Sequence, residues 1–438
     1  MTPISPLLTD LYELTMAAAY FKQGIEAPAT FSLYTRRHPL RGYFVAAGLE
    51  AILAFVEDLR FGTEDIDYLR NTGLFEEAFL SYLSALRFEG DIWALPEGTI
   101  FFADEPILEV TAPIIQSQIL ETILINAVGL ATLIATKAAR CVHAAQGRSL
   151  IDFSLRRTQG ADAGLTVARS SYLAGFDATS NVLAGKQYGI PIAGTMAHSF
   201  VMAFEREIDA FRAYARLFPQ RTLLLVDTYD TLVGARNAAQ VAQEMRIQGH
   251  PLVGVRLDSG DLNALSRQVR AILDQADCKE VKIFASGGLD EYTLDQLLRQ
   301  NAPIDAFGVG TSMGVSADAP YLDMVYKMVQ FNGQPVRKRS FGKATLAGEK
   351  QIFRCASREG EYVEDVIALR SETMPEGYPL LQPVMRAGHR LHPPADLVEL
   401  RSLFQQNFKL LAQAYKGLTN PPRYPVGLSR QLMEMQDY

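Results

Sequence analysis

The sequence predicts an α/β protein: an irregular α/β barrel with an N-terminal α+β domain and a C-terminal extension. Between Ser149 and Ser312, short apolar runs alternate with amphipathic helices at roughly thirty-residue spacing, the pattern of parallel strands with crossover helices. Polar residues or glycines end nearly every run, as at the carboxyl ends of barrel strands. We therefore expect an N-terminal domain at residues 1–148, a barrel carrying the catalytic site at 149–330, and an extension at 331–438 that packs on the N-terminal domain.

The N-terminal domain should be mixed in structure. Residues 8–22 repeat apolar side chains at helical spacing, with Thr9 and Asp10 as candidate caps. Further apolar runs predict a strand at 29–34, a helix at 48–59, a small sheet between residues 90 and 111, and a long helix at 116–145.

The barrel strands are expected where the apolar runs fall. These runs occupy 150–155, 190–194, 222–227, 252–257, 281–286 and 306–310. A long helix should begin near Ser199, and a final helix should span 394–416. Residues 420–438 are proline-rich and then polar, so we expect a loosely packed tail.

Composition limits the class of protein. Hydrophobic residues make up 48% and charged residues 21% of 438, which is ordinary for a globular chain, and the net charge of −7 predicts no broad basic surface for nucleic acid or membranes. The apolar stretch at 116–136 is interrupted by Glu121 and Asn126, which favours a core helix over a membrane span. The three cysteines lie far apart, which fits a reducing cytoplasm.

One histidine stands at a candidate strand-to-helix turn. His198 follows small residues in Gly194-Thr195-Met196-Ala197 and precedes a predicted helix, whose N-terminal N–H groups favour phosphate. An imidazole there can be a base, a phosphate acceptor or a structural hydrogen-bonding group.

Two glycine turns follow the last two predicted strands. They are Ser286-Gly287-Gly288 and the segment from Gly308 to Gly314, which contains Gly310 and Thr311. Such turns expose successive N–H groups, and barrels keep phosphate sites at these strand ends, so together they favour phosphate binding. The second turn is spaced unlike a dinucleotide fingerprint, and the sequence contains no Walker A, HExxH or GxSxG string.

Charged and aromatic residues end other strands. Arg256 suits a carboxylate or phosphate, and Asp258 could hold ribose hydroxyls or Mg²⁺, or cap the next helix. We expect Asp261 to sit in the first turn of that helix, where a negative charge is favourable. Phe153 could stack on an aromatic substrate or belong to the core, and Arg156 could bind that substrate's anionic group. The carboxylates of the string 227–231 could be linked to a metal or cap the helix after them.

Together these strings resemble nicotinate phosphoribosyltransferase, a type II phosphoribosyltransferase. The resemblance covers most of the chain, from the string at 9–12 through 93–113, 152–160, 175–181, 194–200, 256–262 and 286–314. It implies synthesis of nicotinate mononucleotide and pyrophosphate from nicotinate and 5-phosphoribosyl 1-pyrophosphate, a step of NAD salvage, coupled to ATP hydrolysis through a phosphohistidine.

The resemblance also implies roles for individual residues. His198 matches the histidine that ATP phosphorylates, and it is expected to be catalytic together with Asp258. The nicotinate pocket would be lined by Tyr12, Phe153, Arg156, Thr195 and Arg256, and phosphoribosyl pyrophosphate would be held by Arg256, Asp258, Ser286, Gly287, Gly288, Gly310 and Thr311. Mg²⁺ would act on the pyrophosphate, with no ligands assigned. A head-to-tail homodimer with shared active sites is implied, because the family's N-terminal tyrosine reaches a neighbouring pocket.

Other functions stay open at this stage. A nicotinamide-using relative could employ Asp177 toward the amide, although Asp177 more simply caps a helix starting near Thr179. A quinolinate phosphoribosyltransferase should need more cations and no phosphorylatable histidine. A non-catalytic metabolite-binding barrel would have lost the chemistry, and His198, Arg256 and Asp258 together weigh against it.

Overall fold

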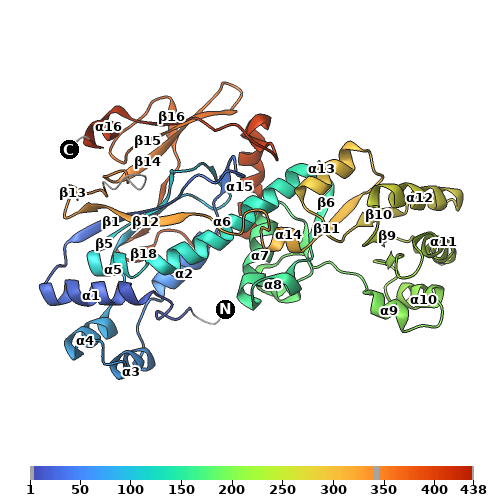
Figure 1. The fold of residues 1–438 in the computed structure, drawn as a ribbon, viewed down its shortest axis with the longest axis horizontal. Coiled ribbons are helices and arrows are strands. Elements are labelled where there is room, and N and C mark those ends of the chain that lie inside the picture. The colour runs from blue at the N-terminus through green and yellow to red at the C-terminus, as the bar shows by residue number, and fades with distance from the viewer. Residues whose placement is uncertain (1–3, 339–344, 437–438) are drawn as a thin grey trace. The chain divides into compact units, whose positions relative to one another are not determined.

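The chain forms two compact units in the computed structural model, which describes residues 4–338 and 345–436 (Figure 1). Unit 1 comprises Met1–Thr136 and Tyr321–Tyr438, and unit 2 comprises Lys137–Pro320. These units divide the chain at other points than the expected 148 and 330. The first observed boundary, after Thr136, falls inside the helix α6 (Glu121–Ala144). The second, after Pro320, precedes β12 (Met324–Phe331), which pairs with β1 (Pro28–Thr35) of unit 1.

Unit 1 is built on a seven-stranded antiparallel sheet in the order β13-β12-β1-β5-β3-β17-β18. The predicted sheet between residues 90 and 111 is therefore part of a larger one, because strands from both ends of the chain join it. Besides β1 and β12, its strands are β3 (Asp91–Ala94), β5 (Pro106–Pro113), β13 (Gln334–Pro335), β17 (Gln382–Arg386) and β18 (His389–Arg390).

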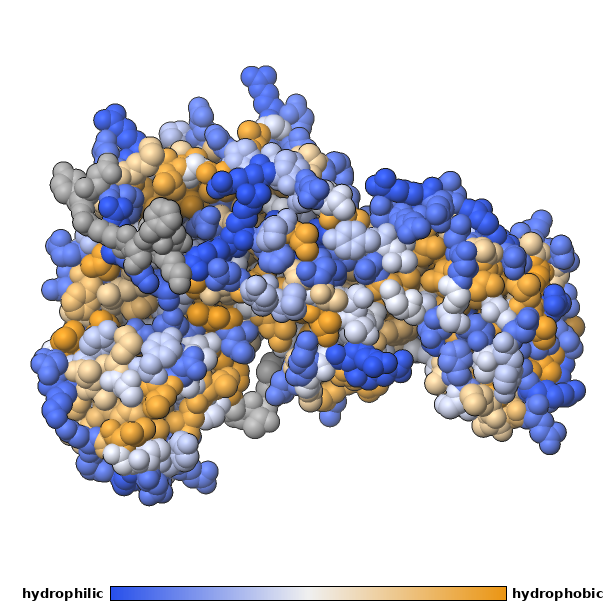
Figure 2. Space-filling view, viewed as in Figure 1, coloured by the Kyte–Doolittle hydropathy of each residue, from blue (hydrophilic) through white to orange (hydrophobic). Residues whose placement is uncertain are grey.

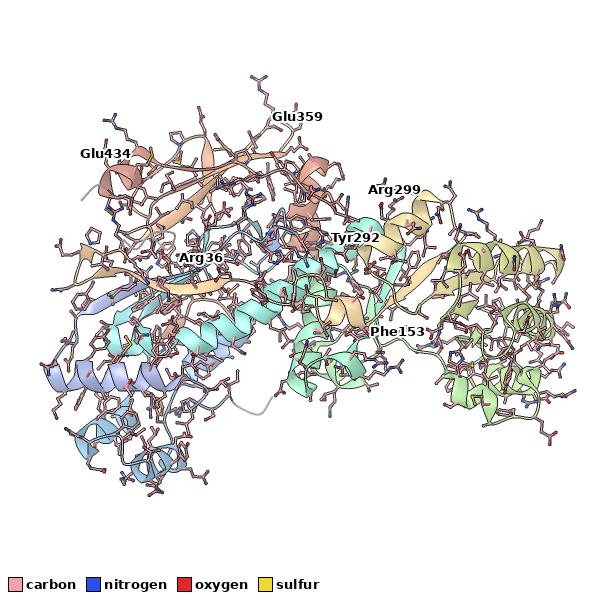
Figure 3. The ribbon with its side chains drawn as sticks, viewed as in Figure 1. Arg36, Phe153, Tyr292, Arg299, Glu359 and Glu434 are labelled. Carbon is pink, nitrogen blue, oxygen red and sulfur yellow. The ribbon has the colours of Figure 1, made fainter. Side chains whose placement is uncertain are left out.

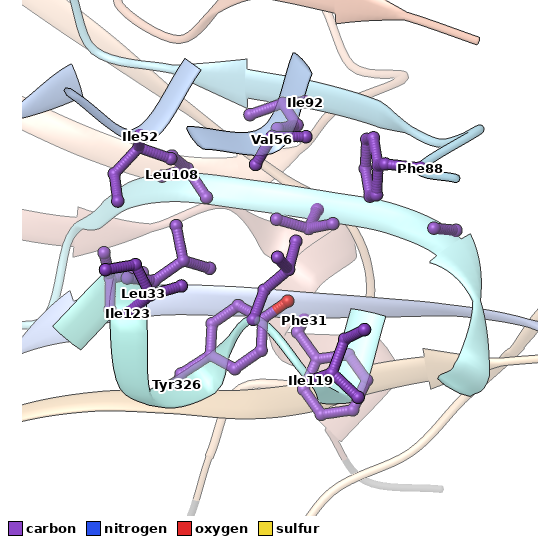
Figure 4. Close-up of a cluster of buried hydrophobic side chains, with 14 of the residues drawn as sticks. Phe31, Leu33, Ile52, Val56, Phe88, Ile92, Leu108, Ile119, Ile123 and Tyr326 are labelled. Carbon is purple, nitrogen blue, oxygen red and sulfur yellow. The ribbon is translucent and has the colours of Figure 1, made fainter. Parts of the chain in front are cut away.

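The central strands of this sheet are buried on both faces, with side chains that alternate in character. Phe31 and Leu33 of β1 and Leu108 of β5 enter the apolar core drawn in Figure 4. Ser32 and Glu109, which alternate with them, are buried in a polar layer on the other face. The period of two therefore assigns one sheet face to apolar packing and the other to paired charges.

Smaller sheets and helices complete unit 1. A four-stranded sheet contains β14 (Lys350–Ala356), β15 (Tyr362–Leu369), β16 (Gly377–Pro379) and β19 (Val426–Leu428), and β2 (Phe44–Val45) pairs with β4 (Ile100–Phe101). The helices are α1 (Leu11–Gln23), α2 (Leu49–Glu57), α3 (Thr63–Asn71), α4 (Glu77–Ala85), α5 (Ile114–Gln118), the first part of α6, α15 (Leu397–Leu410), the short 3₁₀ helix η2 (Gln413–Lys416) and α16 (Arg430–Gln436).

Several predictions for unit 1 are confirmed and one is wrong. The predicted first helix, the strand at 29–34 and the helix at 48–59 are all present. Asp10 stands at the N-cap of α1 but makes no capping bond, since its carboxylate accepts a hydrogen bond from Thr122. The expected loose tail is wrong: β19 and α16 lie there, and Tyr424 and Leu432 are buried. Residues 437–438 of that tail lie outside the described part.

The stretch Ile114–Ala144 could cross a membrane by length and composition alone. However, 67% of its most apolar window is buried inside the protein, as in a core helix. Figure 2 shows hydrophilic and hydrophobic residues mixed over the visible face, as is usual for globular proteins.

Unit 2 contains a six-stranded parallel sheet that curves as a half-barrel, which confirms the predicted α/β class. The strand order is β7-β6-β11-β10-β9-β8. The strands are β6 (Ser149–Asp152), β7 (Ala178–Thr179), β8 (Leu223–Leu225), β9 (Gly254–Leu257), β10 (Lys282–Ala285) and β11 (Ala306–Val309). Its helices are the last residues of α6, η1 (Leu155–Arg157), α7 (Ala161–Leu173), α8 (Val182–Tyr188), α9 (His198–Met202), α10 (Glu207–Leu217), α11 (Thr231–Ile247), α12 (Leu262–Gln275), α13 (Glu291–Arg299) and α14 (Thr311–Gly314).

The barrel is irregular beside β7. The strand expected at 190–194 is reduced to one parallel bridge between Thr179 and Ile192, and Ile192 is exposed. The long helix expected near Ser199 is also wrong, because α9 has five residues and the chain is extended again at Arg206 before α10. The segment around Thr195 is therefore a loop whose side chains are positioned by neighbouring strand ends.

Candidate active site

The candidate site lies in unit 2, at the carboxyl ends of the central parallel strands. β9 and β10 pair with Leu257 opposite Ala285, so the residues that follow these strands, Asp258 and Ser286, come side by side. At the carboxyl ends of the strands, loops replace the hydrogen-bonded sheet, so polar side chains there are available to ligands. Active sites of α/β folds lie at this edge.

Arg256 is a largely buried charge of the site. Its side chain is 13% exposed, and one terminal nitrogen, Nη1, donates a hydrogen bond to Thr195 Oγ1 at 2.6 Å. Burial lowers the pKa of this guanidinium, which the charges of Asp258 and Asp227 partly oppose. Its Nε atom is buried without a hydrogen-bond partner. A buried, incompletely bonded guanidinium is suited to a carboxylate ligand.

Asp258 lies between the other predicted residues. One carboxylate oxygen accepts a hydrogen bond from Ser286 and lies 4.0 Å from Arg256 Nη2, and the other lies 3.9 Å from His198 Nε2. The Asp258 side chain is 35% exposed, so a ligand can reach it. The structure thus brings together His198, Arg256, Asp258 and Ser286, as expected.

Asp227, which follows β8, braces the Asp258 loop. Its Oδ2 accepts a hydrogen bond from the Asp258 backbone N–H at 2.9 Å and another from the Ser259 hydroxyl at 2.6 Å. Its Oδ1 is buried and has no hydrogen-bond partner. Of the two possibilities that the sequence left open for the 227–231 carboxylates, Asp230 is the helix cap, accepting from Leu232 and Val233. Asp261, expected in the first turn of the next helix, is instead the N-cap of α12, so Asp258 is not that cap.

His198 is the first residue of α9, and its ring is held on one side. Nδ1 lies 3.2 Å from Thr228 Oγ1, within hydrogen-bond distance. On the other side, the 3.9 Å gap between Nε2 and Asp258 is longer than a hydrogen bond. The side chain is 40% exposed. One ring nitrogen is therefore occupied and the other is open toward Asp258.

The first glycine turn requires glycine at its second residue. Gly287 has φ +87°, and a Cβ built there would lie 1.9 Å from the Asp258 carbonyl oxygen. Gly288 also has a positive φ, +64°, but open space where its Cβ would stand. Only a residue without Cβ lets the β10 turn pass this close to the β9 loop.

The second glycine turn borders Phe153, labelled in Figure 3. A Cβ at Gly308 would lie 2.4 Å from the Phe153 ring, and one at Gly310 would lie 3.2 Å from the Phe153 carbonyl oxygen. Thr311 begins the one-turn helix α14. Gly308 also lies against the first turn, since its Cβ would be 3.3 Å from that of Ser286. The two predicted phosphate turns are thus neighbours.

Arg156 and Asp152 occupy different positions at the end of β6. Arg156 is exposed on η1, where its charge contributes to lowering the pKa of Arg256. Asp152 is buried and accepts hydrogen bonds from Ser154 and Thr179. Burial raises the pKa of Asp152, and these hydrogen bonds oppose that rise. Asp152 fixes the turn, while Arg156 is available to solvent.

Two further residues singled out from the sequence are Tyr12 and Asp177. Tyr12 is 45% exposed on α1 of unit 1, so its place in the nicotinate pocket stays a prediction. Asp177 does not cap α8, whose cap is Asn181, because Asp177 accepts from the Ser149 hydroxyl at 2.7 Å and the Leu150 N–H at 3.2 Å. The sequence did not reveal that β7 begins directly after Asp177.

Sequence reasoning missed Thr228 and Ser259. Both stand within two residues of a strand-end aspartate, in the strings Asp227-Thr228 and Asp258-Ser259. A search for hydroxyl residues beside these aspartates could have found them, because neighbouring parallel strands end side by side. Within the described residues, no group of three or more His, Cys, Asp or Glu side chains could hold a metal ion.

Comparisons with known proteins agree with this geometry. Family models described as the nicotinate phosphoribosyltransferase N-terminal domain, family and C-terminal domain match residues 7–129, 148–359 and 376–436. Nicotinate phosphoribosyltransferase pncB2 of Mycobacterium tuberculosis (strain ATCC 25618 / H37Rv) is 45% identical, covering 98% of this chain and 93% of that protein. Nicotinate phosphoribosyltransferase of Bacillus subtilis (strain 168) is 37% identical, covering 97% and 92%.

A solved structure gives the same result for the fold. The crystal structure of human nicotinic acid phosphoribosyltransferase has a TM-score of 0.87 and 32% identity, covering 98% of this chain and 99% of that chain. The strand-end site, the three family models and these full-length relatives lead to one conclusion: the chain belongs to the nicotinate phosphoribosyltransferase family.

Proposed function

We propose that this protein forms nicotinate mononucleotide and pyrophosphate from nicotinate and 5-phosphoribosyl 1-pyrophosphate, a step of NAD salvage coupled to ATP hydrolysis. Its relatives carry the name of this activity. The observation that carries the proposal is Arg256, a buried guanidinium with an unpartnered Nε beside the hydroxyl of Thr195. A planar aromatic carboxylate satisfies such a group better than water does, because it accepts two parallel hydrogen bonds.

The same residues suit the sugar phosphate. Asp258 would offer carboxylate oxygens to ribose hydroxyls, and Gly287, Gly288, Gly310 and Thr311 would offer backbone N–H groups to the phosphates. The Ser286 N–H is donated to the Leu257 carbonyl, so Ser286 would contribute through its hydroxyl. Phe153, beside the second turn, provides an aromatic surface for the pyridine ring. Arg156 supplies an exposed second cation.

The transfer needs positioning more than covalent help from the protein. The pyridine nitrogen donates its lone pair to ribose C1, the C1–O bond to pyrophosphate breaks, and pyrophosphate leaves with the bonding electrons. The protein's part is to align the ring, hold the ribose through Asp258 and neutralise the departing charge at the turns.

His198 would couple ATP to this reaction. Its open Nε2 is the atom toward which a phosphoryl donor would be directed. The added negative charge would stand beside Asp258 and the first glycine turn, so it would favour one conformation of these loops and be lost on hydrolysis. That conformation would be the one that binds phosphoribosyl pyrophosphate.

Mg²⁺ fits this site as an ion carried mainly by its substrate. Asp258 offers one accessible carboxylate, and Mg²⁺ is commonly bound by one or two carboxylates together with substrate phosphates. When bound, it would neutralise charge on the departing pyrophosphate. We further propose a cytoplasmic, head-to-tail homodimer, in which the exposed Tyr12 reaches the neighbouring subunit's pocket.

The nicotinamide alternative loses the residue that suggested it. Asp177 is engaged by Ser149 and Leu150, so its carboxylate is committed to the sheet instead of an amide. A non-catalytic barrel would be supported by ligand binding without turnover.

One assay tests the proposed function. Purified protein with phosphoribosyl pyrophosphate receives nicotinate, nicotinamide or quinolinate, each with and without ATP, while mononucleotide is measured. We expect product from nicotinate and stimulation by ATP. His198→Ala should abolish ATP hydrolysis and stimulation, leaving a slow ATP-independent transfer. Full ATP stimulation in His198→Ala would refute the phosphohistidine, and product from nicotinamide alone would refute the substrate.

A further inference from the structure

Thr228 stands on a loop that is fixed on both sides. Before it, Val226 N–H donates to the Arg256 carbonyl at 3.2 Å and Asp227 accepts two hydrogen bonds from the Asp258 loop. After it, Asp230 caps α11 through Leu232 and Val233. The Thr228 hydroxyl is therefore presented from a braced position between two strand ends.

That hydroxyl meets only one of the two ring nitrogens of His198. The distance from Oγ1 to Nδ1 is 3.2 Å, whereas Nε2 faces the Asp258 carboxylate at 3.9 Å, beyond hydrogen-bond distance. A neutral imidazole carries its proton on one nitrogen and a lone pair on the other, and a hydroxyl can either donate to that lone pair or accept from the N–H. Since Thr228 occupies Nδ1, the nitrogen accessible to a phosphoryl donor is Nε2, and Nε2 has a free lone pair only when Nδ1–H donates its hydrogen bond to the Thr228 hydroxyl.

We propose that Thr228 is a positioning residue for phosphoryl transfer to His198: it accepts the Nδ1–H hydrogen bond, so that Nε2 is the nitrogen that becomes phosphorylated. This inference rests on the proposed phosphohistidine. In the step, the Nε2 lone pair attacks the γ-phosphorus of ATP. The bond from that phosphorus to the β,γ-bridging oxygen breaks, and ADP leaves with its electron pair. The Nδ1 proton stays on the ring, donated to Thr228, and Asp258 faces the resulting imidazolium.

The first test is a set of matched variants. Thr228→Val keeps the shape and removes the hydroxyl, Thr228→Ser keeps the hydroxyl, and Thr231→Val makes the same exchange at the start of α11. Phosphoenzyme formation from radiolabelled ATP is timed after rapid mixing. We expect Thr228→Val to slow phosphorylation about 10- to 100-fold, because one hydrogen bond to a ring that becomes charged is lost. Thr228→Ser should phosphorylate within about threefold of the unmodified rate, and Thr231→Val should match the unmodified protein.

The second test identifies the reacting nitrogen directly in the unmodified protein and uses a variant only to assign the signal. Nitrogen-15 labelled histidine in the intact protein reports which ring nitrogen of His198 carries the proton, with His198→Asn to assign the signal. We expect a protonated Nδ1 before reaction and phosphate on Nε2 after it. A proton on Nε2, phosphate on Nδ1, or a Thr228→Val protein that phosphorylates at the normal rate would overturn the inference. A slow Thr228→Ser protein would assign Thr228 a purely structural role and also overturn it.

The two proposals fail in different ways. If ATP labels no histidine in the unmodified protein while nicotinate mononucleotide still forms, the phosphohistidine itself is wrong and Thr228 has no phosphorylation to direct. If His198 is labelled normally in Thr228→Val, the phosphohistidine stands and only the role of Thr228 is wrong.

Discussion

Two buried charge clusters of unit 1, around Asp365 and Glu109, and the charges at the strand ends of unit 2 are paired very differently. In unit 1, Arg354 contacts both oxygens of Asp365, at 2.9 and 2.5 Å, and both residues are almost fully buried. In the same unit, Glu109 is bonded to Lys350, Arg370 and Ser32. At the strand ends of unit 2, the Arg256 Nε and Asp227 Oδ1 atoms lack partners, and His198 stops 3.9 Å short of Asp258.

We infer that this difference separates charges that stabilise the fold from charges that bind a ligand. A buried polar atom without a hydrogen-bond partner costs free energy. The complete pairing of Arg354 with Asp365 shows that this fold can avoid that cost. Buried atoms without a hydrogen-bond partner also occur elsewhere, at Glu105 Oε1 and Glu207 Oε1, but those of Arg256 and Asp227 stand on neighbouring strand ends beside the Asp258 loop. We infer that binding of substrate completes the pairing at this site.

Breaking the Arg354 pair should have the largest effect. Arg354→Met leaves Asp365 buried without its partner, and we expect the free energy of unfolding to fall by about 3–5 kcal/mol, measured by urea denaturation. Arg430→Met is the control, because its pair with Glu434 is exposed and should change stability by less than about 1 kcal/mol. Equal effects of the two variants would remove the distinction between buried and exposed pairs.

Removing Arg256 should affect binding more than folding. In Arg256→Ala, the KM for nicotinate should rise about 10- to 100-fold, since hydrogen bonds to charged groups contribute roughly 1.5–3 kcal/mol. Urea denaturation should show stability equal to that of the unmodified protein or higher, because burial already disfavours the charge. A large loss of stability with unchanged KM would mean that Arg256 belongs to the fold.

The two adjacent glycines of the first turn offer a matched pair. Gly287→Ala forces a Cβ against the Asp258 carbonyl, so the turn must shift, at a cost of about 1–3 kcal/mol, and the KM for phosphoribosyl pyrophosphate should rise. Gly288→Ala meets open space and should cost about 1–2 kcal/mol, from its positive φ alone, with little change in that KM. If both variants have the same KM, the close approach at Gly287 does not shape the phosphate site.

The smallest effect concerns pH and the fully buried Glu105. Burial, with the charge of Asp365 adding to it, raises the pKa of Glu105 well above its ordinary 4.5. Above pH 4.5 the unfolded chain loses a proton that the folded chain keeps, so this group makes the free energy of unfolding fall as pH rises toward the raised pKa. In Glu105→Gln, the free energy of unfolding should fall less steeply with pH above 4.5. Below pH 4.5 its dependence on pH should be the same as in the unmodified protein. Parallel stability-pH curves would show that Glu105 is charged in the folded protein.

Much of the fold could be predicted because local patterns determine it. The apolar runs located five of the six parallel strands, and their polar ends identified Arg256, Asp258 and the glycine turns. The two-residue strand β7 was missed because so short a run has no period to detect. The strand expected at 190–194 failed because Ile192 forms only one bridge and is exposed.

The details of the site depended on contacts between distant residues. Thr228 is 30 positions from His198, and Asp227 is 31 from Asp258. The parallel pairing of β8 with β9 brings Asp227 to Asp258, whereas the contact between Thr228 and His198 depends on where the loop before α9 folds. The large sheet of unit 1 was likewise hidden, because β12 and β17 come from the far end of the chain.

A crystal structure with nicotinate and phosphoribosyl pyrophosphate bound tests the central claim most directly. The account predicts the nicotinate carboxylate against Arg256 and Thr195, ribose hydroxyls on Asp258, and phosphates at the two glycine turns. Ligands bound elsewhere, with the Arg256 Nε and Asp227 Oδ1 atoms still unpaired, would contradict it.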